Sequence, residues 1–182
     1  STAGYSPTTG QNCATGTTTT TTGGGLSVSA GVQPGNSLAP QSATRVPFTT
    51  ISITNGSTAA ATVTGITVER VGLAQDAVLS GIVLVDNASN TQIGTAKTLN
   101  SNHQTTIGEA FTINAGETKR LTVAGNMAAS LSSYSGQVVG INVIAINTSS
   151  TMSGSLPISG ASHTVNSTLS LGSLSTTTSS FD

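Results

Sequence analysis

The amino-acid sequence predicts an all-β fold, an antiparallel β-sandwich of about nine strands, on two observations. Thr, Ser and Gly supply 33, 27 and 21 of the 182 residues, and β-branched residues such as Thr and Val suit the pleated surface of a sheet. Short segments of alternating apolar and polar residues recur roughly every 8–15 residues, with turn residues between them and little helical periodicity. This spacing is typical of two packed antiparallel sheets, and a closed barrel is the alternative.

The composition divides the chain into three parts. Residues 1–25 are a low-complexity Ser/Thr/Gly leader in which six consecutive Thr precede three Gly, and they offer no apolar face for folding alone. Residues 26–175 carry the apolar alternation and are expected to form one β-sandwich domain. Residues 176–182 are a Ser/Thr-rich linker, from which we expect that the chain continues or is truncated.

The first strands are predicted from period-2 alternation. Three apolar residues alternate with Ser at 26–30, and the next strands are expected at 45–54 and 61–71. Both of these longer segments change the phase of their alternation part-way, the second at Gly65. Such a change indicates a β-bulge or a strand that passes between sheets. Pro47 lacks an amide hydrogen, so the segment around it is expected at a sheet edge.

The later elements follow from the same pattern. The most continuously apolar segment, 78–85, predicts a central strand. The turn at 86–90 is rich in Asp and Asn, whose side chains hydrogen-bond to the nearby backbone. The alternation stops at 126–134, where Asn126 is expected to cap a single helical turn. Further strands are expected at 91–99, 105–113, 119–124, 137–147 and 162–174.

The core is predicted from the apolar residues that share a phase within each strand. Alternate residues point to opposite faces of a sheet, so one phase faces the other sheet. The domain is long enough to bury a sizeable core. Stability must come from that core, since the single cysteine, Cys13, has no partner in this sequence for a disulfide. The side chains expected to be largely buried are Val46, Phe48, Ile66, Val68, Ile82, Leu84, Phe111, Leu121, Val123 and Val143.

The low charge excludes several classes of protein. Lys and Arg number five and Asp and Glu six, for a formal net charge of −1, so no basic face is available for a nucleic-acid backbone. No apolar run approaches the roughly 18 residues that a membrane-spanning helix needs. A coiled coil would need more Glu, Lys, Arg and Leu. The hydrophobic content of 35% argues against a disordered chain.

No catalytic arrangement stands out, and we expect no enzyme activity. Because the chain has 27 Ser, some Ser can be combined with His103 or His163 and an Asp in almost any way, so the presence of these residue types is no evidence for a Ser-His-Asp triad. The sequence has no G-x-S-x-G motif. His103 lies in an amide-rich run that predicts a polar loop. Glu109 and Glu117 flank a tight turn, which gives thin support for a paired-carboxylate glycosidase.

Calcium is the one cofactor that the sequence suggests. Asp86, Asn87, Ser89 and Asn90 gather oxygen-bearing side chains in one turn, which Asp76 is free to approach. Ca²⁺ takes six to eight oxygen ligands, and two acids are few for a tight site. The candidate ligands are Asp86, Asn87 and Asn90. The alternative is a turn that hydrogen-bonds to itself without an ion, and the cysteine and histidines form no zinc pattern.

Glycosylation has two sets of candidate acceptors. The N-x-Ser/Thr pattern occurs at Asn55, Asn87, Asn147 and Asn166. In a chain this rich in Ser and Thr, several such patterns arise by chance. The O-linked candidates are Thr17, Thr18, Thr19, Thr20, Thr21 and Thr22, and the alternative for this run is an unmodified tether.

Five segments within 38–137 carry a resemblance to a known group of proteins. They read LAPQSATRVPFTT, ITVERVGLAQDAVLSGIVLVD, IGTAKTLNSNHQ, FTINAGETKRLTVAGNM and LSSYSGQ. Together they look like domains of large secreted surface proteins of candidate-phyla bacteria of the Patescibacteria or Parcubacteria type. Those proteins resemble surface-layer or extracellular scaffold proteins with Ig-like domains joined by Ser/Thr/Gly linkers. The resemblance implies an Ig-like sandwich at the cell surface, and it transfers no catalytic residue.

The low charge favours a subunit that lies against copies of itself. Natural monomers protect exposed strand edges with charge, particularly Lys, and this chain has two Lys. Low net charge also removes the repulsion that keeps copies apart. We therefore expect a structural subunit of an extracellular assembly, either a surface layer or a filament. The alternative is an adhesive or carbohydrate-binding module of a large cell-surface protein, although the chain has no Trp and few aromatic residues on which glycans stack.

The leader, residues 1–25, is expected to mediate contact between subunits. Thr favours extended backbone, and an extended segment can add to an exposed sheet edge through main-chain hydrogen bonds. A length of 25 residues spans up to about 85 Å when extended, which is enough to reach a neighbour. Packing against its own domain is the alternative.

Overall fold

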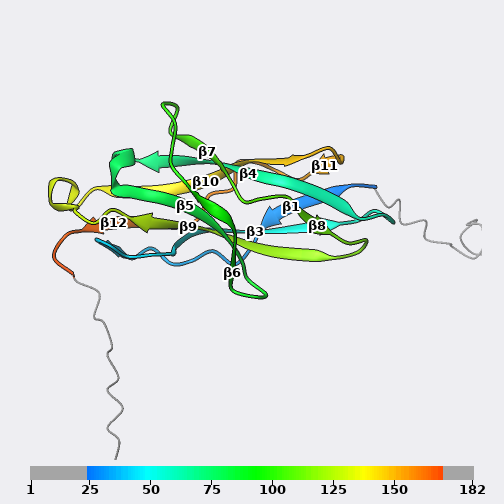
Figure 1. Ribbon diagram of the computed structural model, residues 1–182, viewed down its shortest axis with the longest axis horizontal. Helices are drawn as coiled ribbons and strands as arrows, with labels where there is room; N and C mark the ends of the chain where they lie inside the picture. Colours follow the sequence, from blue (N-terminus) through cyan, green and yellow to red (C-terminus); the bar gives the residue numbers. More distant parts are fainter. Residues whose placement is uncertain (1–23, 170–182) are drawn as a thin grey trace, which may run out of the picture.

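The protein is an all-β sandwich, as the sequence predicts (Figure 1). The computed structural model describes residues 24–169, which form two six-stranded sheets. In order across the first sheet lie β11 (Met152–Ser153), β1 (Leu26–Ala30), β3 (Val46–Asn55), β9 (Thr118–Met127), β5 (Leu79–Asp86) and β6 (Thr91–Lys97). In order across the second lie β2 (Leu38–Pro40), β12 (Ser162–Asn166), β10 (Val138–Thr148), β4 (Ala61–Gly72) and β7 (Gln104–Ile107), with β8 (Phe111–Ile113) also paired to β4.

Both sheets are mixed, so the expectation of purely antiparallel sheets is wrong. β1 pairs in parallel with β11, where Leu26 lies opposite Met152. β12 pairs in parallel with β2, where Thr164 lies opposite Leu38. Both parallel partners are strands of two or three residues that the alternation did not reveal. These two strands, together with the division of the strand expected at 105–113 into two, explain why the described domain has twelve strands and not about nine. An Ig-like topology remains a prediction.

The two changes of phase correspond to irregular pairing. The register between β3 and β9 shifts between Pro47 and Thr49, and the register between β10 and β4 shifts beside Gly65. β3 as a whole lies inside its sheet, between β1 and β9, so the expectation of an edge strand is wrong. Pro47 is tolerated because β1 pairs only with the second half of β3, from Ile51 onward, and because a bulge needs no regular amide bond at that position.

Two other elements differ from the expectation. The strand expected at 105–113 is two strands, β7 and β8, since Gly108 has a φ of 87° and breaks the extended backbone between them. Asn126 is not a helix cap but a residue of β9. The short 3-10 turns of the described chain lie at η1 (Asp76–Val78) and η2 (Ser132–Tyr134). The last strand ends at Asn166, and positions 170–174 lie outside the described residues.

The core lies between the two sheets and matches most of the predicted residues. Eight of the ten are buried: Phe48, Ile66, Val68, Ile82, Leu84, Leu121, Val123 and Val143. Val46 and Phe111 are only half-buried and pack against the margin of the core, so their predicted burial is wrong. Phe111 lies on an edge strand of three residues, which leaves one side of the ring uncovered.

The ends of the described domain lie at opposite ends of its long axis (Figure 1). The predictions for Cys13, for Thr17 to Thr22, for docking of the leader and for the linker 176–182 fall outside the described residues. Within residues 24–169 no helix is long and apolar enough to cross a membrane.

Candidate functional site

The turn that was expected to bind calcium is closed by its own hydrogen bonds. Asp86 ends β5, and its Oδ2 accepts a hydrogen bond of 2.8 Å from Nζ of Lys119 on β9. Its Oδ1 accepts from the backbone N–H of Ala88 at 2.9 Å, which is an Asx turn. Both carboxylate oxygens therefore already have donors. The hydrogen bond from Lys119 holds the pKa of Asp86 below its ordinary value, although burial opposes this shift.

The other two candidate calcium ligands, Asn87 and Asn90, accept hydrogen bonds from neighbouring side chains. Asn87 Oδ1 accepts a hydrogen bond of 2.9 Å from the hydroxyl of Thr122, and the carbonyl oxygen of Asn90 accepts one of 3.3 Å from Nη1 of Arg45. Asp76, the further acid considered, is bound elsewhere. Within residues 24–169, no three acidic, cysteine or histidine side chains come together as a metal-binding group. The calcium site therefore stays a prediction that the observed hydrogen bonds do not favour.

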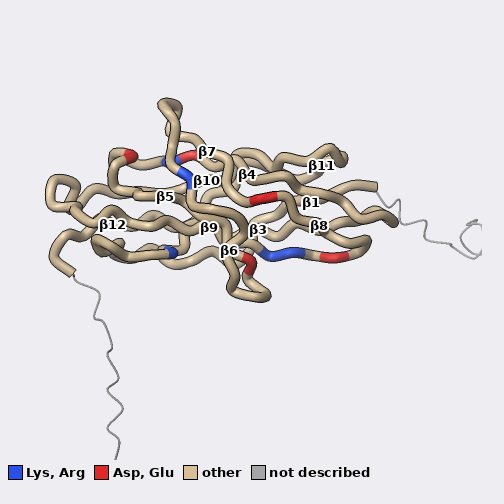
Figure 2. Tube along the Cα trace, in the orientation of Figure 1, with Lys and Arg blue, Asp and Glu red and all other residues tan. Residues whose placement is uncertain are grey.

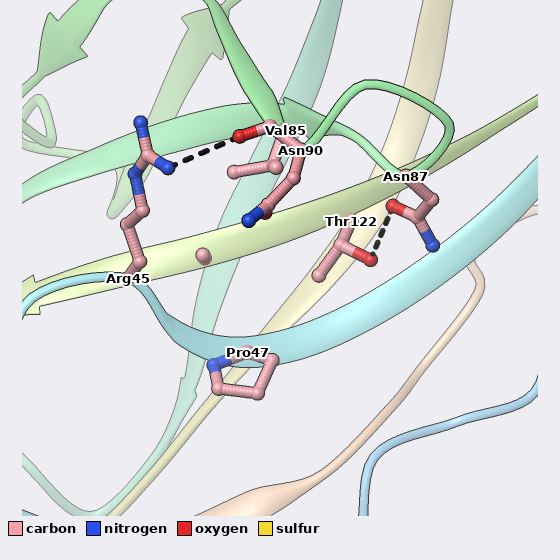
Figure 3. A pocket seen from close by; sticks show the side chains of 7 residues that line it. Arg45, Pro47, Val85, Asn87, Asn90 and Thr122 are labelled. Atoms are coloured by element: carbon pink, nitrogen blue, oxygen red, sulfur yellow. Dashed lines mark hydrogen bonds between the residues drawn. The ribbon is translucent and has the colours of Figure 1, made fainter.

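A hollow of about 330 Å³ lies beside this turn on the outer face of the first sheet (Figure 3). It is lined by Arg45, Pro47, Val85, Asn87, Asn90, Thr122 and Ala124. These residues come from the loop before β3, from β3 itself, from the β5–β6 hairpin and from β9. The sequence did not reveal this hollow, because its residues are as many as 79 positions apart and only strand pairing brings them together.

The floor of this hollow is apolar. Ile82 and Leu84 of β5 point into the main core, so Val83 and Val85 point to the opposite face of the sheet. With Ala124 of β9 they form a small second cluster, in which Val83 and Ala124 are each 1% exposed. An apolar floor under a polar rim is the usual composition of a small-ligand site.

A second hollow, whose lining includes Arg70, Asp76 and His103, contains an ionic cluster. Asp76 Oδ1 accepts a hydrogen bond from Nε of Arg70, and its Oδ2 lies 2.8 Å from Nδ1 of His103. The side chain of His103 is half exposed, and its backbone carbonyl accepts from the amide of Arg70 at 2.9 Å. Burial raises the pKa of Asp76, but the bonds to His103 and Arg70 outweigh it and leave the pKa below its ordinary value. The cluster fastens the loop before β7 to β4 and η1.

The hydroxyl, imidazole and carboxylate groups are not arranged as a catalytic triad in the described part of the chain. His163 is buried, with Nδ1 at 3.0 Å from the hydroxyl of Ser37 and Nε2 at 2.8 Å from the carbonyl of Pro47. The imidazole of His103 bonds to Asp76 and to no other side chain in the described chain. No histidine described joins both a serine and a carboxylate, as a triad requires. The expectation that the chain is not an enzyme stays a prediction.

The four sequons differ in accessibility. Asn55 is fully buried and donates its amide hydrogens to the carbonyls of Ala59 and Ile113, both at 2.9 Å. This burial does not favour Asn55 as an acceptor in the folded domain, and its glycosylation stays a prediction. Asn87 is exposed, whereas Asn147 and Asn166 are half-buried. Glycosylation of these three stays a prediction.

Aromatic rings do not line either hollow. Phe48 is buried, and Phe111 and Tyr134 are half-buried against the core. The described chain thus offers no aromatic platform in its hollows for stacking a sugar. The large apolar side chains that are most exposed are Val32 at 93% and Leu73 at 88%, and both lie in loops.

The charged residues are few and confined to certain elements (Figure 2). Eight of the twelve described strands contain no Asp, Glu, Lys or Arg: β1, β2, β3, β7, β8, β10, β11 and β12. Arg70 with Asp76 and Lys119 with Asp86 neutralise one another. Large parts of both sheets are therefore electrically neutral.

Comparisons with known proteins do not add to these observations. The sequence matches no family model, no curated protein and no solved structure.

Proposed function

We propose that this chain is a structural subunit of an extracellular assembly, a surface layer or a filament, in which copies associate through uncharged strand edges. The observation that carries the proposal is the composition of the outermost strands. Among β2, β6, β7, β8 and β11, which lie at the sheet edges of the described domain, Lys97 of β6 is the only charged residue. Charge on edge strands is a common protection against pairing with another chain.

The second half of β10 is a further uncharged edge segment. β10 pairs with β12 only at Val138–Gly140, and a single bridge joins Val143 to Ile158. From Ile144 to Thr148, β10 meets no strand of residues 24–169 on one side. On the other side Ala145, Ile146, Asn147 and Thr148 pair with β4, whereas Ile144 lies at a bulge and has no partner on β4. The segment reads IAINT and has no charge. Another strand can add there through main-chain hydrogen bonds.

The strands run along the long axis of the domain, so pairing at their edges would set copies side by side (Figure 1). The described chain begins at one end of the long axis and ends at the other (Figure 1). Extracellular location is supported by the abundance of Thr and Ser and by the low charge. Copies of the chain are the proposed partners, and surface glycans are the further candidate partner.

The test is sedimentation velocity of the full chain at increasing concentration, with electron microscopy of the concentrated samples. We expect oligomers that grow with concentration and persist in high salt, because contacts between neutral surfaces are not screened. Ile144→Lys should weaken association by placing a charge in the open segment of β10. Val32→Lys is the matched control, because it makes a similar change in an exposed loop. A chain that stays monomeric throughout, or that assembles equally well as both variants, contradicts the proposal.

An adhesive or carbohydrate-binding module is the second candidate function. The observation that favours it is the hollow beside Arg45, which has an apolar floor and a rim of hydrogen-bonding groups. Such a module would remain monomeric at high concentration and bind a ligand in that hollow. Sedimentation and ligand titration therefore separate the two candidates.

A further inference from the structure

Arg45 places a positive charge at the rim of the hollow in Figure 3 without an acidic partner in the described chain. The ion pairs among residues 24–169 involve Arg70, His103 and Lys119. Within residues 24–169, the side chain of Arg45 makes one hydrogen bond, from Nη1 to the carbonyl oxygen of Asn90 at 3.3 Å. A guanidinium has five N–H donors, so most of them remain available.

The position of Arg45 is fixed from two sides. Its backbone N–H donates to Oδ1 of Asn126 at 3.0 Å, and its side chain is fastened to Asn90. Its φ of 54° lies in the left-handed region, which is uncommon for a residue other than Gly. Asn126, which the sequence suggested as a helix cap, thus helps to hold the guanidinium at the hollow.

The rest of the rim supplies further hydrogen-bonding groups. The side-chain amide of Asn90 extends toward the space between Arg45 and Thr122 (Figure 3), and it makes no hydrogen bond within the described chain. The hydroxyl of Thr122 donates to Asn87, so in the 3.1 Å bond between Thr50 and Thr122 it is Thr50 that donates. The hydrogen bonds from Thr50 to Thr122 and from Thr122 to Asn87 hold these side chains in place on the far side of the rim.

The floor is suited to the carbon face of a small ring. Pro47, Val85 and Ala124 provide it, and the latter two are buried with Val83 in the second apolar cluster. A volume of about 330 Å³ lies at the lower end of the roughly 300–1,000 Å³ typical of ligand sites. The hollow therefore fits a single small ring and not an extended ligand.

We propose that this hollow binds a carboxylate-bearing sugar of monosaccharide size, such as a terminal uronic acid. The planar guanidinium of Arg45 matches a carboxylate in a two-bond arrangement. The amide of Asn90 is available to sugar hydroxyls, and the apolar floor to the ring. A single cation balances the one negative charge of a carboxylate, whereas polyanions such as nucleic acids are bound by many cations. This site is independent of the proposed self-association, because it needs no second copy.

The experiment is a titration of the ¹⁵N-labelled full chain with D-glucuronate, followed by NMR shifts of the Thr122 and Ala124 amides. D-glucose is the neutral control, and L-glutamate tests a carboxylate without a sugar ring. We expect saturable shifts with glucuronate alone. Saturation by glutamate at the same concentration would overturn the assignment to a sugar. The absence of saturable shifts with all three would overturn the site.

Variants test whether Arg45 acts through its charge. Arg45→Gln should weaken glucuronate binding at least tenfold. Arg120→Gln is the matched control, because Arg120 is exposed on the same strand and face as Thr122 but does not line the hollow. Asn90→Gly, which keeps the left-handed backbone at φ 53°, should also weaken binding, and it tests the site if Arg45→Gln fails to fold. Equal weakening by Arg120→Gln would show a general effect of charge and contradict the proposal.

Discussion

The imidazole of His163 meets the ring of Phe48 edge-on, with centroids 4.8 Å apart and planes at 73°. Nε2 of His163 donates to the carbonyl of Pro47, so Nδ1 is the acceptor for the backbone N–H of Ser37 at 3.2 Å. His163 therefore joins β12 to β3 of the facing sheet and to the loop before β2. The contacts of His163 therefore tie the two sheets of the sandwich together.

Replacing His163 tests that structural role. His163→Ala should lower the free energy of unfolding by about 3 kcal/mol, because it removes packing against Phe48 and leaves buried polar groups without partners. Urea denaturation of the variant and the parent chain measures this loss. His103→Ala is the control, since that side chain is half exposed, and we expect it to cost less than half as much. Equal losses would mean that His163 has no special role in joining the sheets.

The two predicted Phe core positions should differ. Phe48→Ala should cost about 3–5 kcal/mol, the usual loss for a buried aromatic residue. Phe111→Ala should cost clearly less, because Phe111 is half-buried on a three-residue edge strand. Thermal or urea unfolding of the two variants checks the order. A larger loss of unfolding free energy for Phe111→Ala than for Phe48→Ala would contradict the placement of Phe48 in the core and of Phe111 at its margin.

Acid should destabilise the domain through Asp76 and Asp86. The pKa of each is lower in the folded chain than its ordinary value. Each group therefore contributes stability that is present above its unfolded pKa and is lost as the pH falls through the folded pKa. We expect the free energy of unfolding to be flat from about pH 7 to 5 and to fall below about pH 4.

Urea denaturation between pH 7 and 2.5 measures this dependence. Asp86→Asn should reduce the slope below pH 4, since it removes the ion pair with Lys119. Glu117→Gln is a suitable control for loss of a negative charge, because that carboxylate accepts hydrogen bonds from Asn114 alone and pairs with no cation in the described chain. An unchanged slope for Asp86→Asn would show that the pair with Lys119 does not contribute.

Calcium removal tests the hypothesis for the turn at Asp86. Because Lys119 and the amide of Ala88 already engage both carboxylate oxygens, we expect a chelator to leave the melting temperature unchanged. The opposite outcome is informative. A lower melting temperature with chelator, abolished by Asp86→Ala, would establish a calcium site and require Lys119 to turn away.

Accessibility should decide which sequons are used in a host that attaches N-linked glycans. We expect occupancy at Asn87 and none at Asn55, whose side chain is buried and bonded to Ala59 and Ile113. Mass spectrometry of tryptic glycopeptides measures both positions. Occupancy at Asn55 would indicate that the glycan is attached before the domain folds.

Local features of the sequence were enough to predict most strands and both irregularities. Alternation with a period of two depends only on neighbouring residues, and it located β1, β3, β4, β5, β9 and β10 to within a few residues. The changes of alternation near Pro47 and at Gly65 coincide with shifts in strand register, and these changes too are visible from neighbouring residues alone. The alternation did not reveal the break at Gly108, which divides the strand expected at 105–113 into β7 and β8. Both strands pair with β4, so their apolar residues keep the same alternation and read as one strand.

Only the tertiary structure decided the parallel pairs and the sites. A strand of two residues such as β11 has no period to detect, and its pairing with β1 depends on the return of the chain after β10. Arg45 meets Asn90, and Asp76 meets His103, across 45 and 27 positions of sequence. Contacts of this kind depend on the register of paired strands and on the loops between them. The sequence by itself therefore determined the strands and their buried faces, because burial repeats along each strand, whereas the hollows arose from strand pairing between distant segments.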